Sequence, residues 1–344
     1  MLTVYSDRHR NHHGRGELID GQMMPCFEMP RRADNILAQV EDARLGAVVG
    51  PRAFGLDPVR RVHDAAYVDF LATAWTDWSA QGRTNDALPL VWPVPGLRHD
   101  RVPDHIDGRL GFYSMDAGVP ITAGTWDAVQ AGADVALTGA HALVAGSGGA
   151  FALCRPPGHH AAAAAMGGYC YLNNAALAAQ HLLDHGCAHV AILDVDYHHG
   201  NGTQSIFYAR RDVLFVSLHA DPRFEYPYFL GYADERGVGA GAGYTANYPL
   251  PPATAWDGYG AALDSACAVI AQDAPDAIVI SLGVDTYAHD PIARFALTSD
   301  DFSRLGERIA RLGRPTLFVM EGGYAVDAIG VNAVNVLTGY EQAR

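Results

Sequence analysis

The segment VAILDVDYHHGN, residues 190–201, joins an apolar run to a group of side chains that can bind a metal. Residues 190–193 are apolar and predict a buried strand, and Asp194, Asp196 and His198 follow at alternate positions. Side chains alternate between the two faces of an extended chain, so Asp196 and His198 point to the same side. Carboxylate oxygen and imidazole nitrogen suit Zn²⁺ and similar divalent ions. The segment therefore predicts a metal site at the end of a strand.

Two further apolar runs are followed by residues that can bind a metal or take part in catalysis. Residues 277–284 (AIVISLGV) are followed by Asp285, and residues 316–320 (TLFVM) are followed by EGGY. In open α/β sheets, ligands collect at the carboxyl ends of parallel strands. We therefore expect these ends to lie beside the segment at 190–201.

The strand ends together suggest a mononuclear metal hydrolase. Asp196, His198 and Asp285 supply three ligands, which leaves a coordination position for water, as a catalytic metal requires. This set is the sequence's candidate metal site.

The segment RPPGHH, residues 155–160, provides candidate proton-transfer groups. Two prolines and a glycine predict a rigid turn, and His159 or His160 can serve as a base at neutral pH. Asp194 and Asn201 are available to accept hydrogen bonds from these imidazoles and fix their tautomers.

Tyr324 follows two glycines in EGGY, residues 321–324. A phenol in that position is well suited to donate its hydroxyl to a developing oxyanion.

The order of the predicted elements indicates one α/β domain. Short apolar runs alternate with helical patterns along the chain, which is typical of βαβ units and a parallel sheet. Strands are predicted at 2–5, 150–154, 190–195, 213–218, 277–284 and 315–320. Helices are predicted at 33–44, 64–80, 125–145, 174–186, 256–272, 300–312 and 326–338. Without an internal repeat or a linker-like change in composition, residues 1–344 are expected to form a single domain, an open, mainly parallel β-sheet with helices on both faces.

Two segments break this alternation, 81–124 and 220–255, and both are rich in glycine and proline. Loops of this length in a compact domain are usually functional. We read 81–124 as an insertion, and expect both segments at the rim of the active site.

Composition limits the class of protein. The chain has 344 residues, of which 49% are hydrophobic and 18% charged, and a formal net charge of −14. This charge argues against nucleic-acid binding through a basic face and suits a cationic small substrate. No apolar run approaches the roughly 18 residues of a membrane span, and the N-terminus lacks a signal-peptide core. We expect a cytoplasmic protein that binds neither nucleic acid nor membrane. Five scattered cysteines without a CxxC pair argue against a disulfide framework and a cysteine zinc site.

Five motifs in order give the chain a specific resemblance. RPPGHH, GGYCYLNN, LDVDYHHGNGTQ, LGVD and EGGY, between about residues 150 and 324, resemble the histone deacetylase superfamily. Segments 1–7, 16–34 and 221–243, with the insertion near 93–124, are similar to bacterial acetylpolyamine amidohydrolases, so the resemblance covers nearly the whole chain. It implies an arginase-like α/β fold. It also implies removal of the acetyl group from small N-acetylated amines such as acetylputrescine, acetylcadaverine and acetylspermidine.

The resemblance assigns roles to the residues already singled out. Asp196, His198 and Asp285 would bind one catalytic Zn²⁺, for which Fe²⁺ or Co²⁺ can substitute. His160, bonded to Asn201, would be the general base and acid. His159, held by Asp194, would be its electrostatic partner, and Tyr324 the oxyanion donor. A structural K⁺ beside the zinc would be bound by Asp194, Asp196, His198, Ser217 and Leu218.

The resemblance also implies a substrate channel. Its walls correspond to Tyr169 and Tyr226, with Gly168 beside them.

In similar enzymes, acidic residues of the insertion contact the distant ammonium groups of the polyamine. Asp107 aligns with one of these acidic positions. Gly118 occupies the second, and Asp116, two residues away, is the candidate substitute. Desolvated carboxylates here would favour a diamine over a neutral amide.

The insertion is also expected to form a homodimer. It carries exposed-type apolar residues such as Leu90 and Val91, and similar enzymes use this loop to cover the partner's active site.

Three alternatives remain open. The chemistry can be the same with acetyl-lysine or another small acetamide as substrate. A binuclear ureohydrolase would need a further carboxylate, for which Asp290 is the candidate. A non-catalytic metal-binding protein would lack the base or the oxyanion donor, whereas His159, His160 and Tyr324 are all present.

Overall fold

The computed structural model describes residues 1–19, 21–96 and 98–344. Asp20, in the motif at 16–34, and Leu97, in the predicted insertion, lie outside the described residues. Within the described part, the main sheet has eight parallel strands in the order β4-β1-β5-β10-β9-β6-β7-β8. Its strands are β1 (Leu2–Val4), β4 (Val48–Val49), β5 (Gly149–Ala152), β6 (Val190–Asp194), β7 (Val213–Ala220), β8 (Thr245–Leu250), β9 (Ala277–Leu282) and β10 (Thr316–Met320). A separate antiparallel hairpin is formed by β2 (Glu17–Ile19) and β3 (Gln22–Met24).

The two faces of the sheet are buried under different helices. Alternation along β6 sends Ile192 into one hydrophobic cluster and Leu193 into the other. The first cluster contains side chains of α3 (Ala65–Ser79), α5 (Thr125–Val144) and α6 (Asn174–Asp184). The second contains side chains of α1 (Arg31–Asp42), α8 (Trp256–Asp273), α9 (Ser299–Ala310) and α10 (Ile329–Ala343). The predicted parallel sheet with helices on both faces is confirmed.

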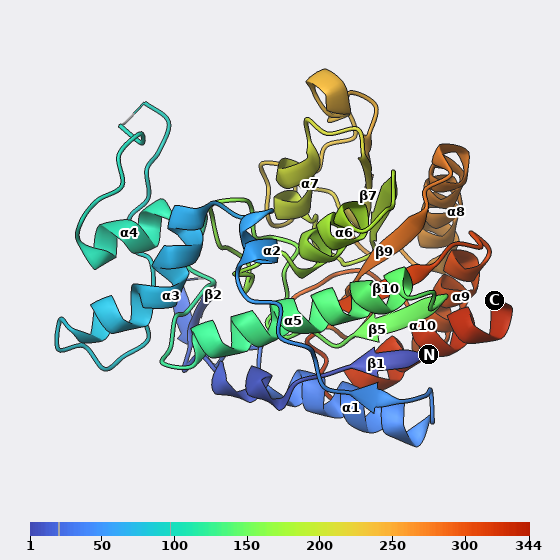
Figure 1. Cartoon of the computed structure of the whole chain (residues 1–344), viewed down its shortest axis with the longest axis horizontal. Coiled ribbons are helices and arrows are strands. Elements are labelled where there is room, and N and C mark those ends of the chain that lie inside the picture. The colour runs from blue at the N-terminus through green and yellow to red at the C-terminus, as the bar shows by residue number, and fades with distance from the viewer. Residues whose placement is uncertain (20, 97) are drawn as a thin grey trace.

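The insertion projects from this body. Figure 1 shows α4 (Ile106–Phe112) and the loop before it standing clear of the sheet, on the side of α3. The two chain ends lie together at the opposite side, where the Met1 ammonium is 3.3 Å from Glu341 Oε2.

Six predicted strands and seven predicted helices form close to the expected positions, but several elements were missed. The reading of 220–255 as a loop was wrong at 245–250, because these residues form β8 at the edge of the sheet. Its sequence TANYPL is polar and contains Pro249, which only an edge strand tolerates. The other missed elements, all short, are β2, β3, β4, α4, α2 (Asp57–Arg60), α7 (Asn201–Phe207) and the two 3-10 helices Asp7–Asn11 and Gly239–Gly241.

Topology brings the chemical motifs to one edge of the sheet. Strands β5, β10, β9 and β6 are consecutive neighbours and parallel. The histidine turn, EGGY, Asp285 and the segment 194–201 follow these four strands, so they meet at the shared carboxyl edge.

Two glycines allow α9 and α10 to touch along their backbones. A Cβ at Gly306 would lie 2.0 Å from the Val336 carbonyl oxygen, and one at Gly339 would lie 2.2 Å from the Ser303 carbonyl oxygen. Gly132 in α5 differs, because its nearest neighbour, Asn174 Oδ1, would be 3.7 Å from an added Cβ.

We expect Gly306→Ala to lower the free energy of unfolding by about 2 kcal/mol or more, because two helix backbones must separate. Gly132→Ala is the matched control and should leave stability unchanged or raise it by up to about 1 kcal/mol, through helix propensity. Urea unfolding of both variants measures the difference. Equal stability of Gly306→Ala and wild type would contradict the close packing.

Candidate metal centre and catalytic site

Asp196, His198 and Asp285 form a buried group with the geometry of a metal site. Their exposed fractions are 0%, 8% and 0%, and their candidate ligand atoms all lie within 4.8 Å of one another. His198 Nδ1 is 3.1 Å from Asp285 Oδ2 and 3.4 Å from Asp196 Oδ1. Burial, reinforced by the charge of Asp196, raises the pKa of Asp285 to about 7. A divalent cation would offset this repulsion, so the residues present fit such an ion.

The backbone around these ligands is shaped to receive them. Asp196 Oδ2 accepts a hydrogen bond from Gly322 N at 2.8 Å, and Asp285 Oδ1 accepts one from Tyr197 N at 2.8 Å. A Cβ at Gly283 or Gly322 would lie 2.0 or 2.5 Å from Asp196 Oδ2. Only glycine leaves room for the carboxylates at these two positions.

The two histidines of the turn have opposite electrostatic environments. His159 Nδ1 is 3.0 Å from Asp194 Oδ2, and although burial lowers the pKa of His159, Asp196 and Asp194 outweigh it and raise the pKa to about 10. Burial and the neighbouring His159 and His198 hold the pKa of His160 well below its usual value. At neutral pH, His159 is therefore cationic and His160 neutral.

The tautomer of His160 follows from its partner. His160 Nδ1 lies 2.7 Å from Asn201 Oδ1. An amide oxygen can only accept, so Nδ1 carries the proton and Nε2 keeps a lone pair. His160 is thus prepared to receive a proton at Nε2.

Tyr324 is held by contacts on its ring and its backbone. It is 6% exposed, and the Arg32 guanidinium lies 4.7 Å from the centre of its ring. Arg32 Nε donates to the Gly323 carbonyl at 2.6 Å, and Tyr324 N donates to Asp290 Oδ2 at 2.7 Å. These contacts fix the turn that carries the phenol.

The Asp290 carboxylate accepts three backbone hydrogen bonds in this role. Asp290 Oδ2 also accepts from Ala325 N at 3.2 Å, and Oδ1 accepts from Ile292 N at 3.1 Å. It is absent from both groups of candidate metal ligands found among the described residues. The geometry therefore does not favour the binuclear alternative.

The second of those groups contains His159, Cys170 and Glu321. Glu321 Oε2 accepts hydrogen bonds from Gly158 N at 2.6 Å and His159 N at 3.1 Å. Burial raises the pKa of Glu321 to about 8. This glutamate joins the EGGY turn to the histidine turn.

A buried ion cluster contacts both the histidine turn and the EGGY turn, and the sequence did not predict it. Arg155 Nη2 donates to Glu28 Oε2, and Arg32 Nη1 donates to Glu28 Oε1, both at 2.9 Å. All three side chains are at most 3% exposed. The sequence feature that could have indicated this cluster is Arg155, which lies directly before the prolines of the histidine turn. Burial raises the pKa of Glu28, but the charges of Arg155 and Arg32 outweigh it and lower the pKa to about 2.

The predicted channel residues lie beside the catalytic side chains. The ring of Tyr169 is 5.5 Å from that of Tyr324, and the ring of Tyr226 is 5.0 Å from that of His160. Gly168 adjoins both His160 and Tyr226, because a Cβ there would lie 2.4 Å from His160 Cδ2.

The acidic residues expected to contact substrate already have protein partners. Asp107, on α4, is 48% exposed on its side chain and forms a two-pronged ion pair with Arg83. Asp116 accepts hydrogen bonds from Gly118 N, Gly168 N and the Tyr226 hydroxyl. Contact of Asp107 with an ammonium group stays a prediction.

Several predicted K⁺ ligands lie where β6 ends beside β7. Asp194 and Ser217 are register partners on these strands, and Leu218 is the next residue. His219 Nε2 lies 2.8 Å from the Gly231 carbonyl, so Nε2 donates and His219 Nδ1 must accept the Ser217 hydroxyl, 2.8 Å away. The lone pairs of Ser217 Oγ remain available.

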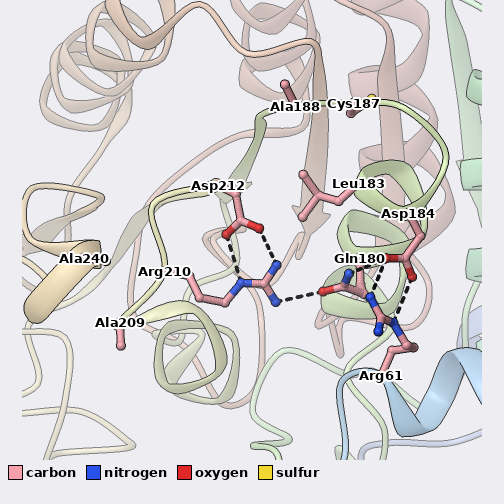
Figure 2. Close-up of a pocket in the computed structure, with 10 residues that line it drawn as sticks. All are labelled: Arg61, Gln180, Leu183, Asp184, Cys187, Ala188, Ala209, Arg210, Asp212 and Ala240. Atoms are coloured by element: carbon pink, nitrogen blue, oxygen red, sulfur yellow. Dashed lines mark hydrogen bonds and ion pairs between the residues drawn. The ribbon is translucent and has the colours of Figure 1, made fainter.

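A surface hollow of about 640 Å³ lies elsewhere (Figure 2). Its lining residues 187–188 and 209–212 precede β6 and β7, so it opens at the opposite edge of the sheet from the candidate site. Its charged groups pair with one another, Arg210 with Asp212 and Arg61 with Asp184. We assign the chemistry to the buried site and not to this hollow.

The fold and the site define a deacetylase-type α/β protein, and the chain belongs to the histone deacetylase family. The histone deacetylase domain matches residues 26–340.

More specific similarity is found with polyamine enzymes. The chain is 62% identical to acetylpolyamine amidohydrolase 1 of Pseudomonas aeruginosa over 344 residues, covering 100% of this chain and 99% of the relative. It is 50% identical to the acetylpolyamine amidohydrolase of Mycoplana ramosa, covering 98% and 99%. A crystal structure of acetylpolyamine aminohydrolase from Burkholderia pseudomallei superposes with a TM-score of 0.95 at 40% identity, covering 100% and 99%.

No helix in the described residues combines the length and apolar character that crossing a membrane requires.

The Glu28 cluster predicts an acid-sensitive contribution to stability. The pKa of Glu28 in the folded protein, about 2, lies below its ordinary value of 4.5. Ionised Glu28 therefore stabilises the fold above about pH 4.5, and this contribution is lost as the pH falls toward 2. Its full size is roughly 3 kcal/mol. The difference in unfolding free energy between wild type and Glu28→Gln should shrink between pH 5 and pH 3, and a constant difference would contradict the assignment.

Proposed function

We propose that this protein is a zinc-dependent amidohydrolase that removes the acetyl group from acetylpolyamines of the acetylputrescine, acetylcadaverine and acetylspermidine type. The observation that carries the proposal is the buried group of Asp196, His198 and Asp285 beside a neutral His160 and the Tyr324 phenol. The names of the most similar relatives support the substrate class. Fe²⁺ or Co²⁺ can take the place of Zn²⁺ with the same ligands.

The metal and the protein divide the chemistry between them. A divalent cation held by the three ligands supplies Lewis-acid activation of water and of the amide carbonyl. His160 Nε2 takes a proton from the attacking water and delivers it to the departing amine nitrogen. Cationic His159, fixed by Asp194, stabilises negative charge beside it. The Tyr324 hydroxyl donates to the oxyanion as it forms.

A monovalent cation is part of the proposal. K⁺ would be held at the end of β6, beside β7, by Asp194, Asp196, Ser217 and the carbonyls of His198 and Leu218. The orientation of the Ser217 hydroxyl toward His219 supports this, because it leaves oxygen lone pairs for the ion. K⁺ would stabilise the end of β6, which is followed by the proposed zinc ligands Asp196 and His198.

The insertion at the rim of the site favours a small substrate and a dimer. The insertion 81–124 carries Leu90 and Val91, whose exposed fractions are 80% and 61%. Apolar residues this exposed mark an interaction surface, and we propose that two copies of the chain associate through it. An insertion at the rim would narrow the entrance, which would favour a small cationic amine over a folded acetylated protein. The net charge of −14 favours the cation. A cytoplasmic location stays a prediction.

The deciding experiment compares kcat/KM for acetylputrescine and for an acetyl-lysine peptide on zinc-loaded protein. We expect acetylputrescine to be preferred by about 10-fold or more, equivalent to about 1.4 kcal/mol. Preference for the peptide would support the acetyl-lysine alternative, and turnover of neither would contradict the proposed function. His160→Ala serves as the inactive control.

Removal of one ligand should remove the metal. Asp285→Ala is expected to lose most bound zinc, measured as moles of metal per chain, together with activity, because two ligands hold zinc poorly. Asp104→Ala, an exposed acid on the insertion, is the control and should keep one zinc per chain. Stoichiometric zinc in Asp285→Ala would remove Asp285 from the ligand set.

Tyr324→Phe should separate kcat from KM. A donor that acts mainly on the oxyanion stabilises the transition state more than the bound substrate. We therefore expect kcat for acetylputrescine to fall by about 10²–10³ with little change in KM. If kcat is unchanged, Tyr324 has no part in the mechanism.

A further inference from the structure

Asp116 is the meeting point of three donors from three segments of the rim. Its Oδ1 accepts from Gly118 N at 2.7 Å, and its Oδ2 accepts from Gly168 N at 3.0 Å and from the Tyr226 hydroxyl at 2.5 Å. A carboxylate offers about four lone-pair positions. Most of the capacity of Asp116 is therefore used inside the protein.

Two of these donors border the general base. Tyr226 meets His160 edge-to-face, with ring centres 5.0 Å apart and planes at 89°, and it lies 6.0 Å from the ring of His198. Gly168 has a φ of +50°, and a Cβ there would lie 2.4 Å from the His160 ring and 2.9 Å from the Tyr226 hydroxyl. The Gly168 backbone, the phenol and the imidazole thus leave no free space between them.

We propose that Asp116 is a positioning residue that holds Tyr226 and the Gly168 turn against His160, and so sets the channel width for every acetamide substrate. It is not the group that recognises the distant ammonium of a polyamine. The sequence could not distinguish these roles, because both need an acid at this place. The proposal rests on the proposed amidase function and concerns how that site selects its substrates.

The two roles predict different responses to charge. A carboxylate that recognises an ammonium matters only for cationic substrates, because a neutral amide never uses its charge. A carboxylate that positions a channel wall affects all substrates alike, because misplacement of reacting groups lowers the rate whatever the distant end carries. Its effect should also require the Tyr226 hydroxyl.

The test uses acetylputrescine and N-pentylacetamide, a neutral amide of similar length, with Asp116→Ala, Tyr226→Phe and the double variant. We expect Asp116→Ala to lower kcat/KM for both substrates by a similar factor, about 10-fold to 10²-fold. The double variant should be little worse than Asp116→Ala alone, because both changes break one interaction. Asp116→Asn keeps an acceptor oxygen without the charge and should restore part of the activity on both substrates. Asp104→Ala, an exposed acid on the other side of α4 in the same insertion, should match wild type.

A second measurement does not depend on turnover. The Tyr226 ring current acts on His160, so the imidazole C–H resonance of His160 should shift in Asp116→Ala when the Tyr226 ring moves. An unchanged resonance, or a loss of activity confined to acetylputrescine, would overturn the proposal. Wild-type protein that hydrolyses neither amide would instead contradict the proposed function, and the resonance would still test the positioning role.

Discussion

The carboxylates of Asp196 and Asp285 lie buried on one side of His198, and their repulsion constrains everything around them. Two like charges without water are unstable unless a cation, backbone amides or protons compensate them. The chain supplies Gly322 N and Tyr197 N as donors to their outer oxygens. Close packing around the carboxylates also requires glycine at positions 283 and 322, since any side chain there would collide with Asp196. These residues thus fit a divalent ion at the point where neighbouring strands end.

Two chemically identical imidazoles acquire different states because their partners differ. His159 is paired with the negatively charged carboxylate of Asp194. His160 is paired with the uncharged amide of Asn201, which offers only a dipole. The cation on His159 then discourages a second charge on His160. The adjacent residues His159 and His160 of one turn therefore differ in charge at neutral pH.

Catalytic turns on long loops need support from outside the site. Here the support is ionic, because Glu28 binds Arg155 at the start of the histidine turn and Arg32 beneath the EGGY turn. Arg32 also contacts the Tyr324 ring. Glu28 and Arg32, which are not among the candidate catalytic residues, therefore fix the position of the His160 turn relative to the Tyr324 phenol. Loss of Glu28 would leave the buried charges of Arg155 and Arg32 without their shared carboxylate, which is costly.

The sequence by itself predicted six of the eight strands of the main sheet and the candidate residues of the site. Apolar runs such as 190–193 predict buried strands. The placement of Asp196, His198 and Asp285 after such runs predicts a common edge in a parallel sheet. It did not predict β8, because an edge strand lacks the apolar pattern of buried strands and tolerates Pro249. Nor could it show that Glu28 pairs with Arg155, 127 residues away along the chain. The state of Asp116 was likewise decided by the tertiary structure, because only folding brings Gly168 and Tyr226 to its oxygens. Periodicity records which side chains are buried, whereas the partners of a buried charge depend on segments that meet only in three dimensions.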